Sequence, residues 1–132
     1  MLETAARHGF SFDTVQMPLN VVDAHFRGFA LLVVPRLTEL EIGILGMKTF
    51  GGADGVILKS KTVEPLECLH YSLNLPTSVV ITGIDKQEIL DQAFQAVKTF
   101  RLMNEEEAKV QPWTESSSPG GQFYAFTGEA AL

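Results

Sequence analysis

The chain has 132 residues, 45% of them apolar, which indicates a globular protein with a substantial core. Its formal net charge of −6, without a dense cluster of Lys and Arg, argues against phosphate-backbone binding, so we expect no nucleic acid partner. The longest apolar run, residues 29–35, is too short to span a bilayer and the first residues show no secretion signal, so we expect a cytoplasmic protein with no membrane partner.

The first part of the chain combines helical and extended patterns. Residues 1–9 predict the last turns of an amphipathic helix that ends at Gly9. Short apolar stretches that contain Val or Ile, each followed by a polar residue, predict strands over residues 12–19 and 42–47. Apolar residues at helical spacing predict a helix between these strands, over residues 23–40.

The same alternation continues in the second part. Residues 63–74 predict a helix, residues 78–83 a strand and residues 86–100 a further helix. Asp85 followed by Glu88 is a capping-box pattern that marks the start of this last helix. A similar pattern over residues 104–107 predicts one more short helix, which Pro112 ends. One apolar stripe runs along the helix of residues 86–100: Ile89, Leu90, Ala93, Phe94, Val97 and Phe100.

This order of elements predicts the α/β class. Strands that alternate with helices form parallel βα units with right-handed crossovers. Three parallel strands do not close a barrel, and doubly wound sheets usually carry five or more. We therefore expect the C-terminal part of a larger α/β protein, with residues 1–107 as its folded portion and residues 108–132 as a C-terminal tail.

Three motifs in order carry a resemblance to a known family. They are VQMPLNVVDAHF at residues 15–26, GILGMKTFGG at 43–52 and PTSVVITGIDKQEILDQAF at 76–94. Together they resemble the C-terminal half of the aldo-keto reductases, specifically a bacterial branch, over residues 1–107. The resemblance implies a partial (β/α)8 TIM barrel, to which this chain supplies strands six to eight with their helices.

The resemblance also implies an oxidoreductase that moves a hydride between NADP(H) and a small carbonyl or alcohol substrate. The family's catalytic Asp, Tyr, Lys and His come from the first four strands and have no counterpart in these motifs. We therefore expect no catalytic residue in this chain, and no activity from the chain alone, although it resembles much of the cofactor side.

Two motifs match the segments that hold the nicotinamide and the pyrophosphate. Gln16 matches the glutamine that hydrogen-bonds the nicotinamide carboxamide, which needs both a donor and an acceptor. Met47 stands where many relatives stack an aromatic ring on the nicotinamide, and a thioether also packs against a ring face. The residues that follow along the pyrophosphate are Lys48, Thr49, Phe50 and Gly51. Without the resemblance, the simplest interpretation of Gln16 is a polar residue at a strand end, that of Met47 is a core residue, and that of Lys48 is a solvated cation.

The third motif matches the segment beside the adenosine 2′-phosphate, where a helix N-terminus favours an anion. Gly83 matches the family pattern. Where relatives place a hydroxyl or basic residue, then Arg or Gln, then Glu and Asn, this chain has Ile84, Asp85, Ile89, Gln92 and Ala93. Asp85 at the expected cap would repel a phosphate. This departure leaves NAD(H) as an alternative to NADP(H).

The remaining reactive side chains have structural explanations. We expect Asp23 to cap a helix, and we give neither it, His25 nor His70 a catalytic or metal role. Cys68, the single cysteine, excludes an internal disulfide and a multi-cysteine zinc site, and its apolar neighbours predict burial.

Two alternatives to the reductase interpretation stay open. The first is a non-catalytic half-barrel that self-associates through its open sheet edges or docks on a partner chain. The second is a phosphate-binding part of an unrelated (β/α)8 enzyme, because loops after strands seven and eight often bind phosphate.

Overall fold

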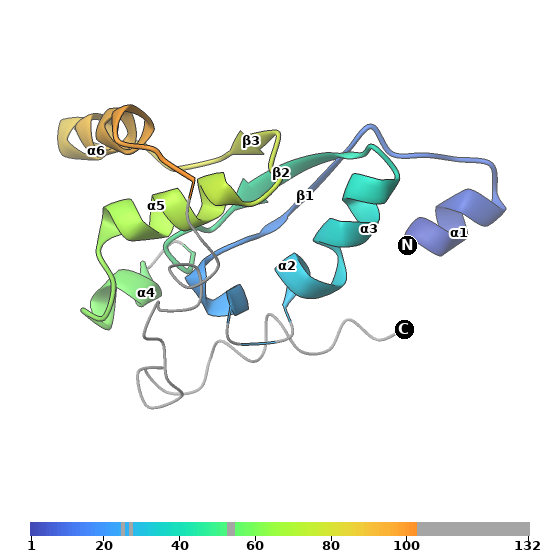
Figure 1. Ribbon diagram of the computed structural model, residues 1–132, viewed down its shortest axis with the longest axis horizontal. Helices are drawn as coiled ribbons and strands as arrows, with labels where there is room; N and C mark the ends of the chain where they lie inside the picture. The colour runs from blue at the N-terminus through green and yellow to red at the C-terminus, as the bar shows by residue number, and fades with distance from the viewer. Residues whose placement is uncertain (25, 27, 53–54, 103–132) are drawn as a thin grey trace.

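The computed structural model describes residues 1–24, 26, 28–52 and 55–102, and Figure 1 shows their arrangement. In chain order the elements are α1 (Leu2–Arg7), β1 (Thr14–Pro18), the 3-10 helix η1 (Val21–Ala24), α2 (Phe29–Leu32), α3 (Val34–Glu39), β2 (Gly43–Met47), α4 (Val56–Lys59), α5 (Pro65–Asn74), β3 (Val79–Val80) and α6 (Gln87–Lys98). The helix predicted after residue 104 and the tail 108–132 lie outside the described residues.

The three strands form one parallel sheet in the order β1-β2-β3. Gln16 pairs with Leu45, and Leu45 pairs in turn with Val79, so these residues share one face of the sheet. The predicted α/β class is confirmed. Within the described residues the sheet is open at both edges, and a closed barrel is not part of the structure.

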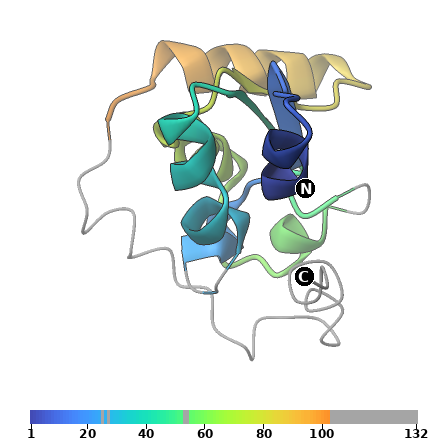
Figure 2. The same ribbon diagram turned by 90° about the vertical axis from the view of Figure 1, so that its right-hand side faces the viewer.

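Helices cover one face of this sheet. Figure 2 shows α2, α3 and α5 together on one side of the strands, with α6 running across the top. Because side chains alternate along a strand, Met17 and Ile44 point into this helical layer and are buried. Gln16, on the other face, is exposed. The sheet therefore has one buried face and one face that the described helices leave largely open.

Two apolar clusters form the core, and Leu75 packs against both of them. The first joins β1 and β2 to α3, and its buried members are Met17, Leu19, Val34, Leu37, Ile42 and Ile44. The second joins η1, α4 and α5, and its buried members are Val21, Val22, Ile57, Val63, Cys68 and Tyr71. The predicted burial of Cys68 is confirmed.

The single helix predicted over residues 23–40 is wrong, because this segment forms η1, α2 and α3 instead. Gly28 is extended, with φ −95° and ψ −168°, and separates η1 from α2. Pro35 lies in the first turn of α3, where the missing N–H costs nothing, so a new helix begins there. The apolar residues of this segment are therefore distributed over three short helical elements instead of one long helix.

The strand predicted over residues 78–83 is also shorter than expected. Only Val79 and Val80 pair with β2, although the Ile81 N–H still donates to the carbonyl of Gly46 at 2.7 Å. Gly83 and Ile84 continue without regular structure and are exposed. The prediction of a helix end at Gly9 is confirmed, since Gly9 has φ 66° and the Phe10 N–H donates back to Ala5 at 2.9 Å.

The capping box lies on a different helix from the one predicted. Helix α6 begins after Lys86 without a side-chain cap, so Asp85 is not its cap. A capping box instead starts α5, where the Glu64 N–H donates to Glu67 Oε2 at 2.8 Å. Sequence spacing alone does not distinguish these sites, because the box also requires the first residue to adopt an extended backbone beside the first turn.

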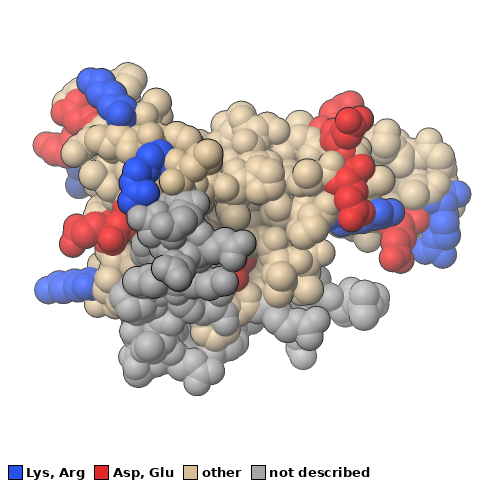
Figure 3. All heavy atoms as spheres, viewed as in Figure 1, with Lys and Arg blue, Asp and Glu red and all other residues tan. Residues whose placement is uncertain are grey.

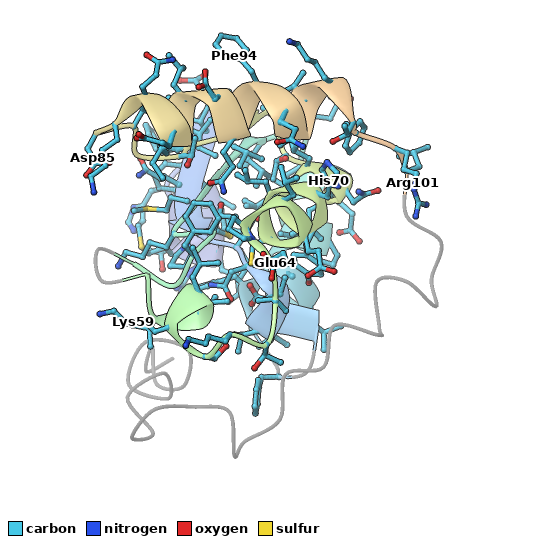
Figure 4. All side chains as sticks on the ribbon, turned by 90° about the vertical axis from the view of Figure 1, so that its left-hand side faces the viewer. Lys59, Glu64, His70, Asp85, Phe94 and Arg101 are labelled. Atoms are coloured by element: carbon cyan, nitrogen blue, oxygen red, sulfur yellow. The ribbon has the colours of Figure 1, made fainter. Side chains whose placement is uncertain are left out.

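Helix α6 packs on α5 with little of its predicted apolar stripe buried. Ala96 is its buried residue, whereas 58% of Phe94 and 67% of Val97 remain exposed. Figure 4 shows Phe94 pointing away from the molecule and His70 of α5 beneath the end of α6. His70 Nε2 lies 3.0 Å from the carbonyl oxygen of Ala96 and 3.2 Å from Thr99 Oγ1, so this imidazole joins α5 to the end of α6.

Candidate functional site

The candidate site lies at the carboxyl ends of the strands. Because the strands are parallel, these ends point to one side of the molecule, the side that faces the viewer in Figure 4. The Leu19 N–H donates to the carbonyl of Met47 at 3.0 Å, so the pairing of the two chains continues one residue beyond β1. The segments that follow β1 and β2 are thus held side by side.

Gln16 and Met47 meet on the open face of the sheet. The Nε2 group of Gln16 donates to the sulfur of Met47 across 3.0 Å. Gln16 is exposed and Met47 is half-buried, so this amide and this thioether can both be reached from solvent. Thioether sulfur is a weak acceptor, and the amide can therefore exchange this contact for a stronger one at small cost.

The turn after β2, residues 48–52, has an unusual backbone. Lys48 has φ 55°, and the Gly51 N–H donates to the Lys48 carbonyl at 2.8 Å. Gly51 and Gly52 follow with φ 85° and 99°, values that favour glycine. A residue with a side chain is uncommon in the left-handed region, so surrounding contacts hold Lys48 there.

Thr49 lies inside this turn with a hydroxyl that has no hydrogen-bond partner. The residue is 2% exposed, and its Oγ1 atom is the unpaired buried polar side-chain atom found among the described residues. Phe50 packs against the second core cluster, and its carbonyl accepts from the Ile57 N–H at 3.2 Å. The turn is therefore anchored at Phe50 while Thr49 keeps unused hydrogen-bonding capacity.

Asn20 and Asp23 form a buried polar link beside this turn, which sequence reasoning did not assign to the site. The Asn20 N–H donates to Asp23 Oδ2 at 3.0 Å, and the Asn20 Nδ2 group lies 3.5 Å from the Lys48 carbonyl. Burial raises the pKa of the Asp23 carboxyl, while hydrogen bonds from the backbone of Asn20, Ala30 and Phe29 act in the opposite direction. The Asn-x-x-Asp spacing after a strand was the available signal.

The third predicted segment comprises the residues that follow β3 and the first part of α6. Gly83 and Ile84 are exposed beyond β3, and Ile89 and Gln92 are partly buried on α6, which packs on α5. Asp85 is exposed near the start of α6, as Figure 4 shows. The structure thus brings together Gln16, Met47 and the turn of residues 48–52. Within the part of the chain that the structure describes, no side-chain hydrogen bond joins Gln92 to them.

The charged side chains of the described residues do not gather into a further candidate site. Figure 3 shows that acidic and basic groups mix at the two ends of the visible face, with a broad uncharged area between them. Among the described residues, no three His, Cys, Asp or Glu side chains gather closely enough to hold a metal ion. His70 is engaged with α6, and His25 lies outside the described residues.

Comparisons with protein-family models, curated proteins and solved structures found no match to this chain. None of the helices that the structure describes combines the length and apolar character needed to cross a bilayer.

Proposed function

We propose that this chain supplies the nicotinamide and pyrophosphate side of an aldo-keto reductase barrel. The intact enzyme would transfer a hydride between NADP(H), or alternatively NAD(H), and a small carbonyl or alcohol substrate. The observation that carries this proposal is the contact of Gln16 with Met47, directly beside the left-handed turn of residues 48–52. Catalytic groups would have to come from outside the residues that carry the resemblance.

The nicotinamide would lie against Gln16 and Met47. The Gln16 amide offers a donor and an acceptor to the carboxamide of the ring, which determines the ring face turned toward the substrate. In doing so it gives up its 3.0 Å contact with the Met47 sulfur, and the thioether is left to pack on the ring. Both side chains lie on the open sheet face, which is the inner face in a barrel.

The pyrophosphate would lie along the turn after β2. Consecutive backbone N–H groups in a turn with left-handed residues form a concave site for anions. Gly51 and Gly52 have no Cβ to block the approach of a phosphate oxygen, and the Thr49 hydroxyl has hydrogen-bonding capacity to spare. Lys48 supplies a positive charge at the same turn.

A titration of the purified chain with NADPH, and separately with NADH, tests this proposal. We expect saturable binding, and we expect Gln16→Ala to weaken it about tenfold, the size of one lost hydrogen bond with its desolvation cost. Gln95→Ala changes the same amide at an exposed site on α6 and should leave binding unaltered. No saturable binding of either nucleotide, or equal loss in both variants, would contradict the proposal.

Activity assays test the expectation that this chain lacks its own catalytic groups. We expect no NADPH-dependent reduction of a simple aldehyde by the chain alone. Measurable turnover that Gln16→Ala abolishes would show that the chain holds a complete site, and our assignment of catalysis to other segments would be wrong.

A second candidate function is that of a non-catalytic module that pairs with a second copy of itself. The observation that favours it is the open edge at β3, where Val79 is half-exposed beside the uncovered sheet face. Self-association should then depend on Val79, so Val79→Lys should give a monomer. Leu31→Lys, at an exposed apolar site on α2, is the control that should leave the mass unaltered. A native mass of one chain for the wild type would exclude this function.

A further inference from the structure

We propose that Asn20 and Asp23 are positioning residues that determine the conformation of the turn after β2, residues 48–52, without touching the cofactor themselves. The consequence for cofactor affinity rests on the proposed function, whereas the effect on the turn does not. A series of polar contacts leads from Asp23 through Asn20 to Lys48.

The Asp23 carboxylate is held in place by the backbone. The residue Asp23 is 9% exposed, and its Oδ2 atom accepts from the Asn20 N–H at 3.0 Å. The backbone amides of Phe29 and Ala30, at the start of α2, also stabilise its charged form. A Cβ at Gly28 would overlap the other carboxylate oxygen, Oδ1, so the glycine leaves room for this carboxylate.

Asn20 is consequently fixed at three of its groups. Its carbonyl accepts from the Asp23 N–H at 3.0 Å, its own N–H donates to Asp23, and its Oδ1 atom accepts from the Val22 N–H at 3.1 Å. These contacts direct the remaining Nδ2 group toward the Lys48 carbonyl, 3.5 Å away on the neighbouring segment. Asn20 is 8% exposed, so water has little access to replace this contact.

The Lys48 carbonyl is the acceptor that closes the turn. It accepts the Gly51 N–H at 2.8 Å as well as facing Asn20, and Lys48 itself has φ 55°. A second donor on the same carbonyl favours the peptide orientation that this left-handed backbone requires. Loss of the Asn20 donor would let the peptide rotate, and the N–H groups of the turn and the Thr49 hydroxyl would move with it.

Asn20→Ser removes the contact between the side chain of residue 20 and the Lys48 carbonyl, and it keeps an acceptor for the Val22 N–H. A serine hydroxyl can still accept from the Val22 N–H, but it is too short to reach the Lys48 carbonyl. Asn74→Ser is the matched control, because the Asn74 amide donates to His70 and Arg101 at the α5–α6 junction. Both variants lose an amide with defined partners, but only the first affects the turn.

Hydrogen exchange of the Gly51 N–H, measured without nucleotide, is the primary test. We expect Asn20→Ser to speed this exchange about threefold to tenfold relative to the wild type. Asn74→Ser should leave the exchange rate unaltered when the two variants are compared at conditions that give them the same free energy of unfolding. NADPH affinity should fall by a similar factor in Asn20→Ser alone. Unaltered Gly51 exchange in Asn20→Ser, or the same acceleration in both variants, would overturn the inference.

Two further measurements separate this inference from the proposed function and from misfolding. A wild-type chain that binds no nucleotide would refute the proposed function, while Gly51 exchange would still decide the inference. Should Asn20→Ser not fold, the wild type suffices: the Asn20 Nδ2 protons should exchange more slowly than those of the exposed Gln95 amide. Equally fast exchange of the two amides would overturn the inference.

Discussion

Ser72 Oγ on α5 donates a hydrogen bond to the carbonyl oxygen of Leu19, 3.0 Å away at the end of β1. Both residues are fully buried. This bond therefore joins the helical layer to the end of the sheet, directly before Asn20 in the chain. The position of the candidate site therefore depends on a residue 53 positions away in the sequence.

Ser72→Ala should lower the free energy of unfolding by about 1–3 kcal/mol, because it leaves the buried Leu19 carbonyl without this donor. Chemical denaturation of the two proteins measures the difference. Ser11→Ala, at an exposed position, is the control and should change stability by less than about 0.5 kcal/mol. Equal effects of the two substitutions would show that the Ser72 bond contributes no net stability.

Gly28→Ala should destabilise the fold by about 1–3 kcal/mol, since its Cβ would overlap Asp23 Oδ1 and something must shift to admit it. In an Asp23→Ala background the added methyl finds space, so most of this cost should vanish. Gly83→Ala is the control, because no atom lies within 4 Å of the added Cβ. An additive double-mutant cycle would refute the proposed contact.

The buried carboxylate of Asp23 predicts a pH-dependent contribution to stability. Burial raises its native pKa above the ordinary value of 3.8, so the native state binds this proton more tightly than the unfolded chain. The resulting stabilisation is present below the ordinary pKa and is lost as the pH rises through the raised native value.

Asn does not titrate in this range, so the stability of the wild type relative to Asp23→Asn should be greatest in acid and should decrease toward neutral pH. Urea unfolding of both proteins over a pH series measures this difference. An NMR titration of the Asp23 carboxyl carbon provides a direct check. A difference that increases toward neutral pH would contradict the predicted sign.

Cys68 should be unreactive in the native protein. Burial first, and then the negative charges of Glu67 and Glu64, raise the pKa of its thiol to about 12. We expect almost no reaction with a thiol reagent at mildly alkaline pH in the native state, and stoichiometric reaction in denaturant. Rapid reaction of the native chain would contradict the burial of α5 against η1 and α4.

Local sequence patterns predicted the elements well where the cause is local. Gly9 ends α1 because it adopts the left-handed backbone that a helix end favours, and short apolar stretches predicted β1 and β2 to within two residues at each end. The same reasoning failed over residues 23–40, where apolar spacing predicted one helix. The extended backbone at Gly28 accommodates the Asp23 carboxylate, and this contact is not visible in the spacing of apolar residues.

The amino-acid sequence by itself determined the alternation of strands and helices, the α/β class and the burial of Cys68, because periodicity and turn residues act over a few positions. Only the tertiary structure decided that Gln16 meets Met47, that Lys48 adopts a left-handed turn, and that Asp23 supports Asn20 beside it. These relationships arise from the parallel register of β1 and β2, which aligns segments about thirty residues apart. Such alignment comes from packing the whole sheet against its helices, and no single stretch of sequence contains it.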